Sequence, residues 1–373
     1  MISHNTGHLP WVLSAAVDLV LAGGAVLWAA RAERPLGRSL TVAVTATLLI
    51  WGAKTLVLLS AGLEVPFGLL HVVWLDLVVV LPAAALLFLV LTRHGAALPL
   101  RVVAGLLVLL APVGAYASFM EPERVVVERA EVRPDPARTG SEPLRVGLIA
   151  DLQVEQVRDR DRRAVRRLLD ERPDLILLAG DHHQGSAERL ERELPGLRDL
   201  FRQLRAPGGV FSVQGDVENV PEARRITRGT GARLLVNDLV RVRVRDRRVT
   251  IAGLELRFGS RAAAAATRRL ERARGAGDVR LLLAHRPDVA LRLRPDTRVD
   301  LVLAGHTHGG QFQFPLLGPP HIASRVPRDV GAGGLHSLGG RRLYVSRGLG
   351  VERGQAPRLR LGATPEVTLL TLR

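Results

Sequence analysis

The sequence predicts an α/β domain that follows a block of membrane-length apolar helices. Two observations lead to this fold class. Apolar runs fill most of the first 120 residues, and each is close to the roughly 20 residues that a helix needs to cross a bilayer. From residue 144 onward, short apolar runs typical of buried strands alternate with stretches of helical periodicity. Such alternation indicates a sheet whose strands are connected by helices.

The N-terminal block predicts four transmembrane helices. Its first run is too long, and is followed by too many similar runs, to be only a cleaved signal peptide. We therefore expect a multi-pass protein of the cell membrane. The four runs lie near residues 10–30, 40–62, 69–92 and 100–118.

The basic residues between these runs predict how the chain crosses the membrane. Residues 31–38 carry three arginines and residues 93–101 carry two, whereas the loop around Glu64 has neither Lys nor Arg. Short cytoplasmic loops are the ones enriched in Lys and Arg. We therefore expect the two basic loops in the cytoplasm, and the N-terminus and everything after about residue 120 outside it.

Three ionisable residues, Asp18, Lys54 and Asp76, fall inside the predicted spans. An ionisable group in hydrocarbon is costly, so it is either paired or functional. One interpretation is an Asp–Lys pair that stabilises the helix bundle. The other is a polar path for a substrate or for ions. The sequence leaves both open.

Residues 121–143 predict a linker that contains an edge strand. Arg124–Val127 has the composition of a strand, and the Pro, Gly and Ser residues between 134 and 141 have turn chemistry. The α/β domain is then expected over residues 144–373.

The net charge of +16 does not by itself predict a nucleic-acid-binding protein. Lys54 is the only lysine among 52 cationic residues, and such lopsided arginine usage is typical of a GC-rich genome. The arginines also alternate with acidic residues, as in 158–163, whereas a nucleic-acid footprint needs clustering on one face. Nucleic acid is therefore not an expected partner, but anionic lipid headgroups and phosphates remain open.

Candidate metal ligands follow directly on the predicted strands. The chain has no cysteine, which excludes disulfides and thiolate sites and leaves His and carboxylates as ligands. Helices predicted at 157–171, 187–204 and 260–274 separate the strands. Five apolar runs end at such residues: Leu144–Ala150 at Asp151, Leu175–Ala179 before Asp181, Val210–Val213 before Asp216, Leu281–Ala284 at His285, and Leu301–Ala304 before His306.

These side chains are expected at one site, because the carboxyl ends of strands in an α/β sheet face one crevice. Each residue alone has a simpler explanation. An Asp after a strand often caps a helix, and a lone His is usually a core or surface residue. Five such placements in one domain, the last of them with the His-x-His of His306 and His308, favour a shared metal site.

Two motifs show a resemblance to a known family. Gly305–Gln311 has the sequence GHTHGGQ, and Tyr344–Gly350 has the sequence YVSRGLG. With the strand-end residues, they resemble the calcineurin-like metallophosphoesterases, most closely the membrane-associated bacterial branch, which includes enzymes acting on lipid-linked pyrophosphates. The resemblance covers about residues 144–372. It implies a four-layer α/β sandwich of two mixed β-sheets flanked by helices.

The family motifs are matched unevenly. The GD motif at Gly180-Asp181, the isolated His at His285 and the GHxH motif are intact. The D-x-H motif falls on residues 151–153, where Gln153 replaces the His. The GNH[DE] motif falls on residues 215–218, where Asp216 replaces the Asn and Val217 the His.

The resemblance implies two divalent metal ions bridged by Asp181. An oxygen-rich ligand set favours Mn²⁺, with Fe, Zn or Mg²⁺ as alternatives. Because Gln153 replaces an imidazole at the first site, we expect the second ion to bind more tightly. Carried over position by position, the first ion would be held by Asp151, Asp181 and His308, with Gln153 as a weak amide-oxygen ligand, and the second by Asp181, Asp216, His285 and His306.

The family's His after Asn binds the phosphate and protonates the leaving group, which Val217 cannot do. His182 and His183, beside Asp181, are candidate catalytic replacements, although a loop His is often merely solvated. Arg347 is a candidate catalytic contact to the phosphate, or else an ordinary surface arginine.

The expected function is that of a membrane-anchored metal-dependent phosphohydrolase with an extracytoplasmic catalytic domain. It would cleave a phosphoester or pyrophosphate, in a phosphorylated small molecule or a lipid-linked substrate, through a dinuclear site with a bridging hydroxide. The alternative is a catalytically weakened domain that acts as a metal- or phosphate-binding sensor or docking module. Transport through the four spans is a third interpretation.

Overall fold

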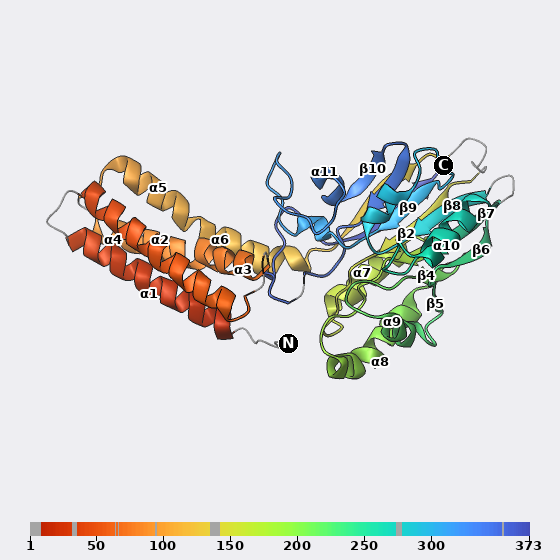
Figure 1. The fold of residues 1–373 in the computed structure, drawn as a ribbon, viewed down its shortest axis with the longest axis horizontal. Helices are drawn as coiled ribbons and strands as arrows, with labels where there is room; N and C mark the ends of the chain where they lie inside the picture. Colours follow the sequence, from red (N-terminus) through yellow and green to blue (C-terminus); the bar gives the residue numbers. More distant parts are fainter. Residues whose placement is uncertain are drawn as a thin grey trace. The chain divides into compact units, whose positions relative to one another are not determined.

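The computed structural model describes residues 9–31, 36–63, 65, 67–93, 95–134, 142–273, 278–352 and 354–373. Arg34, Glu64 and His94, on which the orientation prediction partly depends, and the turn segment 135–141 lie outside the described residues. The chain divides into two units (Figure 1), one spanning Met1–Met120 with Arg353–Arg358, and the other Glu121–Glu352 with Leu359–Arg373.

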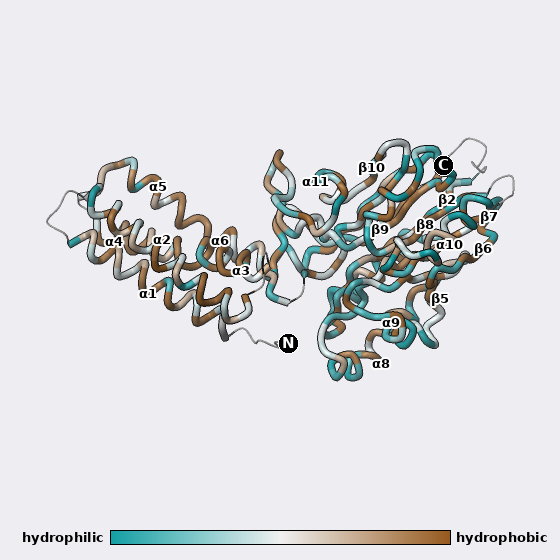
Figure 2. Tube along the Cα trace, viewed as in Figure 1, coloured by the Kyte–Doolittle hydropathy of each residue, from teal (hydrophilic) through white to brown (hydrophobic). Residues whose placement is uncertain are grey.

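Apolar helices make up the first unit. Within the described residues, four helical stretches are long and apolar enough to cross a membrane: Trp11–Arg31, Gly37–Ser60, Phe67–Leu91 and Leu98–Glu123. Figure 2 shows how strongly hydrophobic this part of the chain is. The elements are α1 (Leu9–Arg31), α2 (Leu36–Ser60), α3 (Phe67–Leu75), a π-helical turn at Asp76–Val80, α4 (Leu81–Leu91), α5 (Leu98–Val108), α6 (Leu110–Ala115) and a second π-helical turn at Tyr116–Met120.

Large apolar side chains cover the outside of these helices. Val20 is 75% exposed and Leu49 is 71% exposed, which would be unfavourable over so wide a surface in water. In a bilayer the same side chains face lipid tails, which are as apolar as leucine. The unit is therefore suited in length and composition to a membrane.

The three ionisable residues inside the predicted spans, Asp18, Lys54 and Asp76, have partners inside the unit. Lys54 forms an ion pair with Asp18, and its Nζ also donates to Ser14 Oγ at 2.9 Å. Trp51 Nε1 donates to Asp76 Oδ2 at 2.6 Å. The structure thus contains the Asp–Lys pair that was one of the two interpretations.

A short C-terminal segment also belongs to the helical unit. Gln355 Nε2 donates to the carbonyl of Gly62 at 3.0 Å, and the Gln355 carbonyl lies 3.2 Å from His71 Nδ1. The α/β domain expected over 144–373 is therefore interrupted near its C-terminus by residues that pack with the helices.

Two six-stranded sheets form the second unit, with strand orders β1-β12-β2-β3-β4-β5 and β10-β11-β9-β8-β7-β6. Both are mixed, since β12 is antiparallel to β2, β6 to β7 and β10 to β11, while the other neighbours are parallel. The strands are β1 (Val126–Val132), β2 (Leu144–Ile149), β3 (Leu175–Leu178), β4 (Val210–Ser212), β5 (Ala232–Leu234), β6 (Asp238–Val244), β7 (Arg247–Gly253), β8 (Asp278–Leu283), β9 (Leu301–Ala304), β10 (Gly334–Leu338), β11 (Arg341–Val345) and β12 (Glu366–Leu372).

Strand β3 shows how the layers are built. Successive side chains on a strand point to opposite faces. Leu175 and Leu177 pack into the core between the two sheets, while Ile176 and Leu178 pack against the outer helices. A third core lies under the helices of the second sheet. The predicted four-layer sandwich is confirmed, with outer helices α7 (Asp159–Asp170), α8 (Ala187–Gln203) and α9 (Val220–Thr227) on one side, and α10 (Arg261–Glu271) and α11 (Arg328–Gly331) on the other.

The expected edge strand is longer than its sequence signal. Strand β1 pairs with β12 in parallel from Val126↔Glu366 to Val132↔Leu372 and lies at the edge of its sheet. It therefore extends the α/β unit beyond residue 144 toward the N-terminus. Local sequence did not show this because the pairing partner lies at the far end of the chain.

The Asp18–Lys54 pair is expected to stabilise the helical unit as a pair. Lys54→Met leaves a poorly exposed carboxylate without its partner, and removing one member of a buried pair costs on the order of 3–5 kcal/mol. We expect Lys54→Met to lower the unfolding temperature of the detergent-solubilised chain, and the Asp18→Asn/Lys54→Met double variant to recover most of the loss. Leu49→Met, on an exposed position of the same helix, is the control. A double variant less stable than Lys54→Met would contradict the pairing role.

Candidate metal centre

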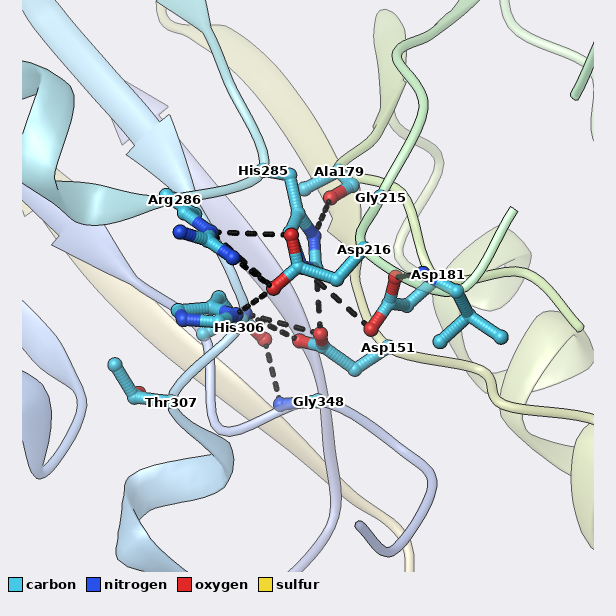
Figure 3. A network of polar contacts seen from close by, with 12 residues as sticks. Asp151, Ala179, Asp181, Gly215, Asp216, His285, Arg286, His306, Thr307 and Gly348 are labelled. Atoms are coloured by element: carbon cyan, nitrogen blue, oxygen red, sulfur yellow. Dashed lines mark hydrogen bonds and ion pairs between the residues drawn. The ribbon is translucent and has the colours of Figure 1, made fainter. Parts of the chain in front are cut away.

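The candidate ligands lie at the carboxyl ends of strands from both sheets. Asp151, Asp181 and Asp216 follow β2, β3 and β4 of the first sheet, whereas His285 and His306 follow β8 and β9 of the second. Because the two sheets pack face to face, these ends meet, and Figure 3 shows the five side chains pointing toward one another. The predicted convergence of strand-end residues is therefore seen in the structure.

The five residues fall into two groups that share His285. Asp216, His285 and His306 form one group, and Asp151, Asp181 and His285 form the other, with ligand atoms of each group within 4.8 Å of one another. His285 Nε2 lies 3.5 Å from Asp181 Oδ2 and 3.9 Å from Asp216 Oδ2. His306 Nδ1 lies 3.0 Å from Asp216 Oδ2. These separations are close to those between ligands of one cation.

The hydrogen bonds of His285 show that a cation fits. Its Nδ1 lies 2.8 Å from the carbonyl of Ala179, which can only accept, so the proton is on Nδ1. Nε2 then carries a lone pair, is buried, and has no hydrogen-bond partner within the described residues. A buried lone pair facing carboxylates is repulsive unless a cation lies between them. His285 is therefore oriented as metal-binding histidines are, with its second nitrogen on a carbonyl.

His306 is held in the same way. Its Nε2 lies 2.7 Å from the carbonyl of Ala323, so Nδ1 faces Asp216. Its backbone N–H donates to both carboxylate oxygens of Asp151, at 2.9 and 3.0 Å. One residue thus positions ligands of both groups.

Crowded charges perturb the carboxylates of the site. Burial and the charge of Asp181 raise the pKa of Asp151 well above its usual range. The same two causes raise the pKa of Glu218 to about 8. Burial acts against ionisation of Asp216 too, but the contacts with His306 Nδ1 and with the Arg286 guanidinium hold its pKa below the usual range. A divalent cation would relieve the repulsion among these groups.

The backbone at the site is strained. Asp151, Asp181, His306 and His308 have φ of 49°, 54°, 75° and 51°, a left-handed conformation that costs a non-glycine residue on the order of 1 kcal/mol or more. Neighbouring glycines are required by close contact. A Cβ at Gly215 would lie 2.0 Å from Asp181 Oδ1. The chain therefore turns sharply just after the strands, at residues that carry candidate ligand atoms.

The position of Gln153 sets the first site apart. Its Nε2 lies 3.2 Å from Asp181 Oδ2 and 3.1 Å from His308 Nε2, while its Oε1 is buried without a hydrogen-bond partner in the described part of the chain. The amide thus lies between two of the ligands expected for the first ion. Rotation of the amide would place Oε1 there instead. His308 belongs to neither close group, and Glu352 Oε2 lies 3.8 Å from its Nε2.

The structure does not bring the three predicted catalytic residues to the cluster. His182 is buried with Nε2 2.8 Å from Ser212 Oγ and its ring edge-to-face with Phe201. His183 is also buried, and Arg189 and Glu155 are the charges that influence it. Burial lowers the pKa of both imidazoles to about 4, so both are neutral near pH 7.

Arg347 is held by carboxylates of the sheet edge. Its Nε donates to Glu366 Oε2 at 2.6 Å and its Nη2 to Glu128 Oε2 at 2.9 Å. The guanidinium therefore ties β1 to β12, and its donors face these two side chains rather than the cluster. Arg347 belongs to a motif that can be read from the sequence, but the direction of its side chain depends on Glu128 of β1 and Glu366 of β12.

Two residues outside the sequence prediction support the site. Arg286 donates two hydrogen bonds to the Asp216 carboxylate, from Nε to Oδ1 at 3.0 Å and from Nη2 to Oδ2 at 2.9 Å. Glu218 accepts hydrogen bonds from the backbone N–H groups of Gly215 and His182, at 2.9 and 3.1 Å. The signal for Arg286 was the replacement of Asn by Asp at position 216, since an added charge needs a partner.

The chain is similar in sequence to several known proteins. A family model described as calcineurin-like phosphoesterase matches residues 144–310. Phosphodiesterase YaeI of Escherichia coli K12 is 30% identical over 220 residues, covering 55% of this chain and 72% of that protein. The uncharacterized metallophosphoesterase YkuE of Bacillus subtilis 168 is 27% identical over 268 residues. The match covers 69% of this chain and 89% of that protein. A solved structure of a dimetal phosphatase from Danio rerio is 14% identical with a TM-score of 0.32. The match covers 55% of this chain and 88% of that chain.

Substitutions at Gln153 are expected to change how many metal ions the chain retains. When wild-type chain loaded with Mn²⁺ is dialysed against a chelator, one ion should leave before the other. Gln153→Leu should lose that ion more readily, whereas Gln153→His, which supplies an imidazole, should hold it about tenfold more tightly. Elemental analysis of the dialysed protein measures the ratio of metal to chain.

The matched control is Gln203→Leu, at the end of α8 and outside the cluster. Equal metal retention by wild type, Gln153→Leu and Gln153→His would show that residue 153 has no part in metal binding.

Proposed function

Because this chain belongs to the calcineurin-like metallophosphoesterase family, we propose that it is a membrane-anchored metal-dependent phosphohydrolase that cleaves a phosphoester or a pyrophosphate. One observation carries the proposal: the buried Nε2 of His285, with its lone pair facing Asp181 and Asp216. A divalent cation between these three side chains would bind the lone pair and both carboxylates at once. Phosphodiesterase is the activity named for YaeI, which shares 30% identity with this chain.

The chain's own residues would hold the metal ions in the arrangement expected for a dinuclear site. Bound together, two divalent cations activate water and neutralise the charge on phosphoryl oxygens. The oxygen-rich donors favour Mn²⁺. Asp151, Asp181, Gln153 and His308 would hold the first ion, and Asp181, Asp216, His285 and His306 the second.

Position 217 supports a substrate with a stable leaving group. Val217 has no proton to give, although its backbone N–H donates to Asp181 Oδ1 at 2.9 Å. His182 and His183 are turned toward other partners. A pyrophosphate, whose leaving group departs as a phosphate anion, needs less protonation than an alkyl ester. We therefore propose a pyrophosphate, free or lipid-linked, as the preferred substrate class.

The helical unit supports anchorage in a membrane. Its four helical stretches have the length and composition to cross a bilayer, and its exposed apolar side chains are suited to lipid. The arginine-bearing loops favour a cytoplasmic location for themselves and an outside location for the α/β unit. With that orientation, the α/β unit would meet its substrate on the extracytoplasmic side of the cell membrane.

Metal-dependent hydrolysis is the direct test. The full chain in detergent, supplied with Mn²⁺, should hydrolyse bis(p-nitrophenyl) phosphate, and Asp181→Asn and His306→Gln should each lower the rate by more than about 100-fold, since even groups that only orient ligands cost 10–100-fold when lost. Asp296→Asn and His336→Gln, at positions outside the site, are the controls. Metal bound without turnover on monoesters, diesters or pyrophosphates would favour the sensor function instead.

The orientation is tested separately with reporters fused after Arg373. Alkaline phosphatase, which folds only outside the cytoplasm, should be active in the fusion, and green fluorescent protein exported in the same position should be dark. The reverse pattern would place the α/β unit in the cytoplasm.

A further inference from the structure

We propose that Arg286 is a phosphoryl-binding residue of this site and supplies the positive contact that an imidazole at position 217 would otherwise make. The proposal deepens the proposed function and rests on it for the class of ligand. It does not rest on the identity of the substrate, because the ligand chemistry is that of any phosphoryl group.

Arg286 is placed at the site by its neighbours in sequence. It directly follows His285 at the end of β8 and precedes the 3-10 turn Pro287–Arg292. Figure 3 shows its guanidinium directed at the Asp216 carboxylate next to His306. The backbone of residue 286 lies next to the cluster, and a long side chain is needed to contact both carboxylate oxygens of Asp216.

The contact with Asp216 is bidentate and leaves donor groups unused. Nε contacts Oδ1 at 3.0 Å and Nη2 contacts Oδ2 at 2.9 Å. A guanidinium has five N–H donors, and Nη1 takes no part in these contacts with Asp216. The Arg286 side chain is 41% exposed, whereas that of Asp216 is 13% exposed. One side of the guanidinium is thus anchored, while much of the side chain stays open to solvent and therefore to a ligand.

The charges explain why an arginine is suited to this position. Asp216 adds a negative charge where the GNH[DE] motif has a neutral amide, and this charge would oppose the approach of an anionic phosphoryl group. Arg286 offsets that charge. Its planar guanidinium matches two phosphoryl oxygens better than an ammonium does, and anchoring by Asp216 lowers the entropy lost when a ligand binds.

Arg286 could instead serve only to hold Asp216 in place. The two roles differ in what happens once position 216 is neutral. In an Asp216→Asn background, a purely structural Arg286 no longer has a charge to neutralise, so its loss should have little further effect on phosphate binding. A phosphoryl-binding Arg286 still contributes in that background. Coupling between neighbouring residues is measured in this way by double-mutant cycles.

The primary test uses inorganic phosphate as the probe, with the Mn²⁺-loaded full chain in detergent and isothermal titration calorimetry. Arg286→Gln should weaken phosphate binding about 10–100-fold, the size expected for loss of a charge-assisted hydrogen bond. Arg286→Lys should fall between the two. Metal content, measured on each sample, should be unchanged. Arg294→Gln, an exposed arginine paired with Asp296, is the matched control.

Two backgrounds complete the test. Arg286→Gln should still weaken phosphate binding when added to Asp216→Asn, and Val217→His should restore binding to Arg286→Gln by returning an imidazole. A silent Arg286→Gln in the Asp216→Asn background, or full phosphate binding by Arg286→Gln alone, would overturn the proposal.

The outcomes separate this inference from the proposed function. If the wild type binds phosphate through Arg286 but hydrolyses neither phosphoesters nor pyrophosphates, the inference stands and the phosphohydrolase proposal fails. If hydrolysis is found while Arg286→Gln binds phosphate like the wild type, the proposed function stands and the inference fails. A wild-type chain that binds no phosphate when loaded with Mn²⁺ would also overturn the inference.

Discussion

One hydrogen bond between the two sheets determines the chemistry of the site. His285 follows β8 in one sheet, Ala179 follows β3 in the other, and Nδ1 of the first donates to the carbonyl of the second at 2.8 Å. The bond fixes the tautomer of a fully buried imidazole and directs its Nε2 lone pair toward Asp181 and Asp216. The same contact that aligns the strand ends therefore creates the need for a cation.

Buried charge is matched by opposite charge or by hydrogen bonds elsewhere in the chain. Lys54 pairs with Asp18 among the helices, and Arg347 pairs with Glu366 beneath the sheet edge. Arg360 is fully buried and donates to backbone carbonyls, including those of His308 and Arg347. An unmatched buried charge is costly, so these pairings are expected wherever a charge is taken out of water.

The candidate metal centre differs from this pattern. Neutral N–H groups of His306 and Val217 hydrogen-bond Asp151 and Asp181, and burial with mutual repulsion raises the pKa of Asp151. Asp216 is the exception within the cluster, because Arg286 neutralises it. The departures from the family motifs thus have different consequences. Asp216 is paired with Arg286, and the Gln153 amide lies between two candidate ligands. Val217 contacts Asp181 through its backbone N–H.

The sequence alone determined much of this protein. Apolar runs predicted the helices, since length and hydropathy are local properties. The strand-end pattern predicted six residues at one site, of which five lie in the two close groups and His308 lies in neither: Asp151, Asp181, Asp216, His285, His306 and His308. Strand ends converge in any α/β sheet, so this prediction needed no coordinates. The four-layer fold followed from motif resemblance and was confirmed.

Tertiary structure decided where the remaining side chains point. His182 and His183 lie beside Asp181 in sequence, yet burial against Ser212 and next to Arg189 takes them away from the cluster. Arg347 meets carboxylates from β1 and β12, and Gln355 joins the helical unit through Gly62 and His71. Each outcome depends on partners far away in the chain, and local sequence does not encode the direction of a side chain toward them.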